Sequence, residues 1–267
     1  MATVSPLRAA GALSAARTVS SSARISLARR LVAEGLGTAL LIAVVIGAGV
    51  HAHRLSGGDA MWTLLVQSLA GGAGLCALLL TFGPISGAQL NPAVTVSAVL
   101  QGNLRWHEGA GYVGAQLMGA VLGVAMAHGM YGMPAWSAGT HAVAAPHLWW
   151  SEALATFGLM AVGIACARRS PQWLPVAVAA YIGAGYWFTG SSSLANPALT
   201  LACALTDGPS GIRPGDVPGY MLAQFAGMLA ATPLFGWLLG SSPEQRQVML
   251  AGDSGIPVRS VHQRKAG

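Results

Sequence analysis

The sequence predicts an all-α membrane protein with six transmembrane helices and two half-spanning re-entrant helices, arranged as an inverted repeat. The first observation behind this prediction is composition: 54% of the 267 residues are apolar or aromatic, 8% are charged, and the mean hydropathy is +0.57. A soluble domain carries about 25% charged residues, so an ordinary soluble enzyme is not expected. A disordered chain is excluded because it would be poor in Val, Leu and Ile. The other two observations are six apolar segments and a repeated polar motif.

The chain begins with a segment that has no run of spanning length. Residues 1–30 are rich in Ser, Ala and Arg and contain no acidic residue, and they are predicted to be a disordered cytoplasmic tail. The same composition is typical of an organellar transit peptide, which stays as the alternative. A cleaved secretory signal is excluded because the first apolar run, residues 31–50, is long enough to span a bilayer.

A channel domain is expected over residues 31–240, followed by a cytoplasmic tail over 241–267. Tryptophans mark several segment ends, as in an interfacial aromatic belt: Trp62, Trp106, Trp149, Trp150, Trp173 and Trp237. The expected spans cover residues 31–50, 60–82, 109–130, 148–167, 173–190 and 217–239.

The basic residues indicate the orientation of the spans. If the N-terminus is cytoplasmic, twelve of the 14 Lys and Arg residues lie on the cytoplasmic side, and only Arg54 and Arg213 lie on the other. By the positive-inside rule, both termini are expected in the cytoplasm, with the protein in the cell's inner (plasma) membrane. The basic residues form no stripe with interleaved aromatics, so no nucleic-acid partner is expected.

Two short apolar segments do not fit the six spans. Residues 91–101 and 196–206 reach about 15 Å as helices, which is half of the hydrocarbon core. Each segment opens with Asn-Pro-Ala, at Asn91, Pro92, Ala93 and at Asn196, Pro197, Ala198. Asn is a helix cap and Pro suits the first helical position, so both segments are predicted to be half-spanning helices.

The Asn-Pro-Ala motif belongs to a longer internal repeat. Residues 112–120 match residues 220–228, and Glu34 and Thr38 match Glu152 and Thr156. Each half, about 31–130 and 148–239, therefore holds three spans and one half-helix. An odd number of spans forces the halves into opposite orientations, so the two half-helices are predicted to meet N-terminus to N-terminus near mid-membrane.

This arrangement predicts a pore or a binding site, because broken backbone at mid-membrane is tolerated only where protein buries it or a watery cavity adjoins it. Each helix N-terminus contributes about half a positive charge, which repels cations and protons. The side-chain amides of Asn91 and Asn196 would donate to the oxygen of a neutral solute and interrupt a proton wire.

These residues identify a resemblance to the aquaporin and glycerol-facilitator family, the major intrinsic proteins, over about residues 30–240. The matching motifs are residues 33–38 (AEGLGT), residues 86–95 (SGAQLNPAVT), the Tyr-x-x-Ala-Gln-x-x-Gly of span three and the second Asn-Pro-Ala. The resemblance implies a right-handed helix bundle, one pore per subunit, a homotetramer in the lipid bilayer, and passive transport without a cofactor.

Departures from the family pattern fall in the narrow outer filter. Leu199 stands where most members have arginine, Gly71 stands near the usual bulky aromatic, and Ser193 holds the third position. The fourth position is Ile182 or Ala184, because the loop over residues 189–195 carries two extra residues. Gln89 replaces the usual His before the first motif. Such a filter is wide and has no fixed charge.

The substrate follows from this filter and from residues 187–200, which resemble a bacterial branch associated with arsenic resistance. Trivalent arsenic acid is uncharged at neutral pH and shaped much like glycerol. The expected substrates are therefore neutral metalloid acids, methylated arsenicals and polyols, with water as a possible companion. The alternatives are a water-selective aquaporin and, with less support, a secondary transporter.

Other polar residues leave alternatives open. Glu34 and Glu152 would suit a proton-coupled mechanism, but the resemblance favours a structural role in which each accepts backbone N–H groups of a loop. The histidines of the predicted outer loops would suit a pH sensor, although solvated loop residues are the expected interpretation: His51, His53, His141 and His147. His128 is expected to be an interfacial or packing residue. No metal site, disulfide framework or catalytic constellation is expected, so no enzyme is predicted.

Overall fold

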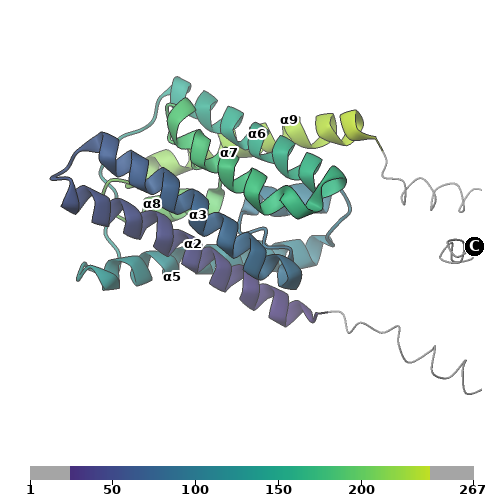
Figure 1. The fold of residues 1–267 in the computed structure, drawn as a ribbon, viewed down its shortest axis with the longest axis horizontal. Helices are drawn as coiled ribbons and strands as arrows, with labels where there is room; N and C mark the ends of the chain where they lie inside the picture. The colour runs from purple at the N-terminus through teal and green to yellow at the C-terminus, as the bar shows by residue number, and fades with distance from the viewer. Residues whose placement is uncertain (1–24, 241–267) are drawn as a thin grey trace, which may run out of the picture.

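The computed structural model describes residues 25–240, which contain helices, turns and loops but no β-strand. Six long helices and two short ones make up most of this range (Figure 1). The long helices are α2 (Leu27–Leu55), α3 (Ala60–Ser86), α5 (Trp106–Met130), α6 (Pro146–Arg169), α7 (Leu174–Phe188) and α9 (Val217–Leu239). The short helices are α4 (Pro92–Leu100) and α8 (Pro197–Cys203), and two 3₁₀ turns, η1 (Pro171–Trp173) and η2 (Pro214–Asp216), precede α7 and α9.

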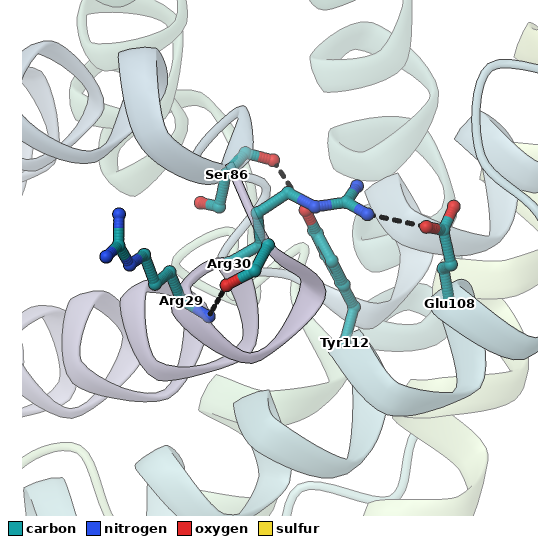
Figure 2. Close-up of polar contacts among 6 residues, drawn as sticks. Arg29, Arg30, Ser86, Glu108 and Tyr112 are labelled. Atoms are coloured by element: carbon teal, nitrogen blue, oxygen red, sulfur yellow. Dashed lines mark hydrogen bonds and ion pairs between the residues drawn. The ribbon is translucent and has the colours of Figure 1, made fainter. Parts of the chain in front are cut away.

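The first helix starts earlier than predicted. Residues 27–30 were expected in a disordered tail, but they form the first turn of α2. Ser26 caps this turn by accepting a hydrogen bond from the backbone N–H of Arg29. Arg30 also forms an ion pair with Glu108 of α5 and lies over the ring of Tyr112 (Figure 2). The rest of the predicted N-terminal tail and all of the C-terminal tail, 241–267, lie outside the described residues.

Five helices of the described part of the chain are long and apolar enough to cross a membrane by length and composition: α2, α3, α5, α6 and α9 with η2. The remaining span expected over residues 173–190 corresponds to α7, which has only 15 residues. At 1.5 Å per residue α7 reaches about 22 Å, and η1 extends the same segment at its N-terminal end.

The packing of the helices repeats between the two halves. α2 packs against α5 and α3, as α6 packs against α9 and α7. α4 contacts α5 of its own half and α9 of the other, and α8 contacts α9 and α5 in the same way. α3 meets α7 and α4 meets α8, so these pairs lie at the centre of the pseudo-symmetry. This pattern is the inverted repeat that the sequence predicts.

Close contact between helices depends on two equivalent glycines. A β-carbon at Gly119 of α5 would collide with the backbone carbonyl of Gly35 in α2, and one at Gly227 of α9 would collide with that of Ala153 in α6. Gly119 and Gly227 both lie three residues after the glutamine of the repeated motif, Gln116 and Gln224. The repeat therefore specifies a close helix crossing in each half, as small residues do in membrane bundles.

Both ends of the described chain lie on one side of the bundle, which we call the terminal face. In Figure 1, α2 (purple) begins and α9 (yellow-green) ends at the right-hand side. On this face, the Tyr112 hydroxyl donates a 2.9 Å hydrogen bond to the Ser86 carbonyl at the end of α3 (Figure 2). Together with the Arg30–Glu108 ion pair, this bond fixes the ends of α2, α3 and α5 relative to one another.

Candidate solute pore

The two short helices meet at their N-termini in the middle of the bundle. Asn91 caps α4 by accepting a 2.8 Å hydrogen bond from the Ala93 N–H, and Asn196 caps α8 by accepting a 2.9 Å bond from the Ala198 N–H. Pro92 and Pro197 take the first helical positions, where no N–H is needed. The sequence repeat therefore forms the same cap twice.

The two asparagine amides join the halves. Asn91 Nδ2 donates a 2.8 Å hydrogen bond to the Ala195 carbonyl, and Asn196 Nδ2 donates a 2.9 Å bond to the Leu90 carbonyl. Each amide has a second N–H, which these bonds leave available. Both asparagines line the central cavity, so these N–H groups can donate to a solute oxygen.

The loops that lead into α4 and α8 have an unusual backbone. Five non-glycine residues have positive φ angles between 45° and 60°: Ala88, Leu90, Ser192, Ser193 and Ala195. A side chain in this left-handed region costs of order 1–3 kcal/mol, and such residues persist only where surrounding contacts determine the backbone. In both loops those contacts come from a buried glutamate.

Glu34 holds the loop before α4. Its carboxylate accepts hydrogen bonds from the N–H groups of Gln89 at 3.0 Å and Leu90 at 2.7 Å, and from the Ser86 hydroxyl at 2.6 Å. The Gln116 amide adds a fourth bond at 2.8 Å. Glu34 is fully buried, and these four donors offset the cost of removing its charge from water.

Glu152 holds the loop before α8 in the same way. Its two oxygens accept 2.9 Å hydrogen bonds from the N–H groups of Leu194 and Ala195, and the Gln224 amide donates a further bond at 2.7 Å. Glu152 is also fully buried. Neither carboxylate is among the residues that line the central cavity, so both face the loops rather than the solute path.

Three cavities follow one another through the bundle, because neighbouring cavities share lining residues. An outer cavity of about 290 Å³ lies on the face opposite the terminal face, and a cavity of about 200 Å³ opens toward the terminal face. Between them lies a central cavity of about 70 Å³ beside both Asn-Pro-Ala motifs. The central cavity is therefore the smallest of the three.

The residues predicted for the filter meet around the central cavity. Gly71 of α3, Ile182 of α7, Ser193 of the second loop and Leu199 of α8 all line it. Ala184, the alternative to Ile182, is exposed and is not a lining residue. None of the described residues around this cavity is charged. Leu199 is one of these uncharged lining residues.

Two polar atoms beside the cavity have no protein partner among the described residues. Gln89 Oε1 and Ser193 Oγ are both buried without a hydrogen bond. Gln89 lines the central and terminal-face cavities, and Ser193 lines the central one. A buried unpaired polar atom of this kind costs about 1–3 kcal/mol.

The predictions from sequence missed Tyr186. This side chain comes from α7 and lines both the central and the outer cavity. Val178, Ile182 and Tyr186 are spaced four residues apart and all line the central cavity, so they form one face of α7. The spacing of four residues from Ile182, a predicted filter residue, was the signal in the sequence that could have identified Tyr186 as a lining residue.

The histidines occupy different surroundings. His51 stacks near Tyr131 with ring centroids 5.8 Å apart, His53 and His141 line a further cavity near Asp207, and His147 is exposed. His128 is fully buried, with its ring nitrogens 2.6 Å from the Pro134 carbonyl and 2.8 Å from the Thr206 hydroxyl. Across residues 25–240, no group of three or more His, Cys, Asp or Glu side chains is placed to hold a metal ion.

Comparisons with known proteins agree with this geometry. The family model described as "Major intrinsic protein" matches residues 21–192. Aquaglyceroporin AqpS of Rhizobium meliloti is 45% identical over 213 residues, covering 80% of this chain and 91% of that protein. Human Aquaporin-9 is 32% identical over 106 residues, covering 40% of this chain and 35% of that protein. The X-ray structure of the aquaglyceroporin from Plasmodium falciparum shares the fold, with a TM-score of 0.58 and 22% identity, over 79% of this chain and 94% of that one.

Proposed function

The chain belongs to the major intrinsic protein family, and from this premise we propose that it is a passive channel for small neutral solutes. One observation carries the proposal: the small central cavity beside both Asn-Pro-Ala motifs has no charged side chain among its described lining residues. Two helix N-termini point at this cavity and disfavour cations. A neutral solute that accepts hydrogen bonds from Asn91 and Asn196 is what the site fits.

Within that class, the proposed substrates are neutral metalloid acids, such as trivalent arsenic acid, methylated arsenicals and polyols, with water as a companion. Leu199 and Gly71 remove an arginine and an aromatic from the constriction, which favours solutes larger than water with some apolar surface. The similarity to a relative named an aquaglyceroporin supports a path wide enough for polyols.

A water-selective channel is the competing candidate, and the observation in its favour is the small central volume of about 70 Å³. A proton-coupled transporter has less support, because Glu34 and Glu152 accept four and three hydrogen bonds and are not among the residues that line the central cavity. We assign both carboxylates a structural role in holding the loops before α4 and α8.

The family membership also supports proposals about context. We assign the protein to the inner (plasma) membrane, with the terminal face toward the cytoplasm and the chain assembled as a homotetramer. Blue-native electrophoresis and chemical cross-linking of the protein in native membranes test the assembly. Labelling of single cysteines introduced on the two faces tests the orientation.

The function is tested with purified protein in proteoliposomes, by light scattering after an osmotic challenge. We expect entry of glycerol and arsenite at rates far above empty liposomes, unaffected by an imposed proton gradient. Fast water efflux with no solute entry would establish the water-selective alternative. Solute accumulation driven by a proton gradient would establish a transporter instead.

A further inference from the structure

Tyr186 stands where the solute path passes from the outer to the central cavity. These two cavities share three lining residues, Val45 of α2, Tyr186 of α7 and Leu194 of the second loop, which together form a neck. Tyr186 is the largest of the three, and its side chain is only 7% exposed. Its small exposed surface borders both cavities, and the ring does not project into open solvent.

The ring of Tyr186 reaches into space left by Gly71. A β-carbon built on Gly71 would lie 3.4 Å from the Tyr186 hydroxyl oxygen and 3.7 Å from a methyl carbon of Val45. A methyl group therefore fits beside the tyrosine, but an aromatic side chain at position 71 would need the volume that Tyr186 occupies. A glycine at position 71 would by itself widen the path. With Tyr186 beside it, an aromatic side chain is still present, but it comes from α7 and not from α3.

The neighbours of Tyr186 fix the end of α7. Trp187 Nε1 donates a 3.0 Å hydrogen bond to the Ser68 hydroxyl on α3, one turn before Gly71. On the other side, the absence of a side chain at Gly185 lets Ser193 approach, since a β-carbon there would lie 2.5 Å from Ser193 Oγ. Tyr186 is thus placed between α3 and the loop that carries Ser193.

The phenol group offers chemistry that an arginine lacks. Tyr186 makes no side-chain hydrogen bond to any described residue. Its hydroxyl oxygen is also not among the fully buried polar atoms that lack a partner in the described part of the chain, so it keeps some accessible surface. A phenol both donates and accepts, whereas a guanidinium only donates. Solute hydroxyls also donate and accept, so one phenol can pair with a hydroxyl in either sense.

We propose that Tyr186 is the specificity-determining residue of the neck, in which its ring sets the size limit and its hydroxyl selects solutes rich in hydroxyl groups. This inference rests on the proposed function, since it names the residue that discriminates among neutral solutes. It follows that the filter is displaced toward the outer cavity and its aromatic is contributed by α7.

Two substitutions separate the ring from the hydroxyl. Tyr186→Phe keeps the ring, and we expect glycerol entry to fall about three- to tenfold, the worth of one hydrogen bond. Entry of 1,2-propanediol, which lacks one hydroxyl, should fall less than about twofold after subtraction of the lipid pathway. Tyr186→Ala removes the ring and should admit erythritol and xylitol. The control is Tyr181→Phe, one and a half turns earlier on α7, because Tyr181 is not among the lining residues of these cavities.

A paired exchange tests the link to Gly71. Gly71→Phe alone should block solute entry, because its ring competes with Tyr186 for one volume. Gly71→Phe combined with Tyr186→Ala should restore glycerol entry and exclude erythritol again. Every variant is first shown by gel filtration to be folded to the same degree as wild type, and Tyr186→Phe keeps the inference testable if Gly71→Phe does not fold.

The outcomes separate the two proposals. If the wild-type channel admits neither glycerol nor arsenite, the proposed function is wrong. If the wild-type channel admits them but Tyr186→Phe and Tyr186→Ala leave all solute ratios unchanged, Tyr186 does not determine specificity and the inference is overturned.

Discussion

Glu34 and Glu152 occupy equivalent places in the two halves, and each uses both carboxylate oxygens to hold two consecutive backbone N–H groups of the loop before a short helix. The second N–H group of each pair belongs to Leu90 or Ala195. The carbonyls of these same two residues accept a hydrogen bond from the asparagine of the other half. The glutamate of each half thus positions a backbone carbonyl that accepts a hydrogen bond from the asparagine of the other half.

The first prediction concerns these carboxylates. Glu34→Gln replaces one acceptor oxygen by an NH₂ group, which leaves a buried backbone N–H facing a donor at a cost of about 1–3 kcal/mol. We expect less folded protein and a lower midpoint of thermal unfolding in detergent, with the pH dependence of solute flux unchanged. Glu152→Gln should behave alike.

Glu108→Gln is the matched control for the carboxylates. Its ion pair with Arg30 is partly exposed, with side-chain accessibilities of 18% and 24%, so its loss should lower the stability only slightly. Normal abundance of Glu34→Gln with an altered pH profile of flux would mean that the glutamate takes part in transport.

The second prediction concerns the neutral centre of the path. Leu199→Arg places a cation at the N-terminal end of α8, where it narrows the cavity and repels the partial positive charge. We expect arsenite and glycerol entry to fall about tenfold, equivalent to a barrier raised by about 1.4 kcal/mol. Leu199→Met preserves size and neutrality and should transport normally. Equal arsenite entry through Leu199→Arg and wild type would refute the role assigned to this position.

The third prediction concerns helix crossing. Gly119→Ala forces a methyl group against the Gly35 carbonyl and should destabilise the protein by about 1–3 kcal/mol, the usual cost of overpacking. Gly114→Ala on the same helix is the control, because a β-carbon there meets nothing within 4 Å. Thermal unfolding in detergent compares the two, and equal midpoints would show that α2 and α5 separate at little cost.

The fourth prediction concerns charge at the helix tips. Asn91→Asp keeps an oxygen to cap α4 but loses the N–H that binds the Ala195 carbonyl, and it adds a negative charge beside the helix N-termini. We expect slower glycerol entry and a faster proton leak, measured with a pH-sensitive dye trapped in liposomes. Asn103→Asp is the control, since Asn103 is exposed at the terminal-face cavity. A proton leak of the same size in both variants would contradict the assignment.

Much of the fold was predictable because its signals are local and occur twice. Asn-Pro-Ala specifies its own cap, and spans of apolar residues specify their own helices, so α4 and α8 begin within one residue of the predicted segments. The start of α2 was placed too late because the ion pair that orders Arg30 involves Glu108, which lies 78 residues away. An ion pair between residues so far apart in the chain produces no periodic pattern in the sequence.

The site was less predictable than the fold. The positions Gly71 and Leu199 follow from counting along motifs, but the neck depends on Tyr186 entering the space beside Gly71 from a different helix. Neither residue alone indicates this contact. The positive φ angles at Ser192 and Ser193 were also hidden, because a buried carboxylate and not a glycine stabilises that loop.

The reciprocal bonds between Asn91 and Ala195 and between Asn196 and Leu90 also constrain biosynthesis. The paired residues are separated by 104 and 106 positions in the chain, so the first half leaves the ribosome before its partners in the second half have been synthesised. Until α8 inserts, the tip of α4 holds unpaired polar groups inside the bilayer, where each costs several kcal/mol. Docking of the two tips therefore has to wait for the second half of the chain, and truncated nascent chains should remain accessible to membrane quality control.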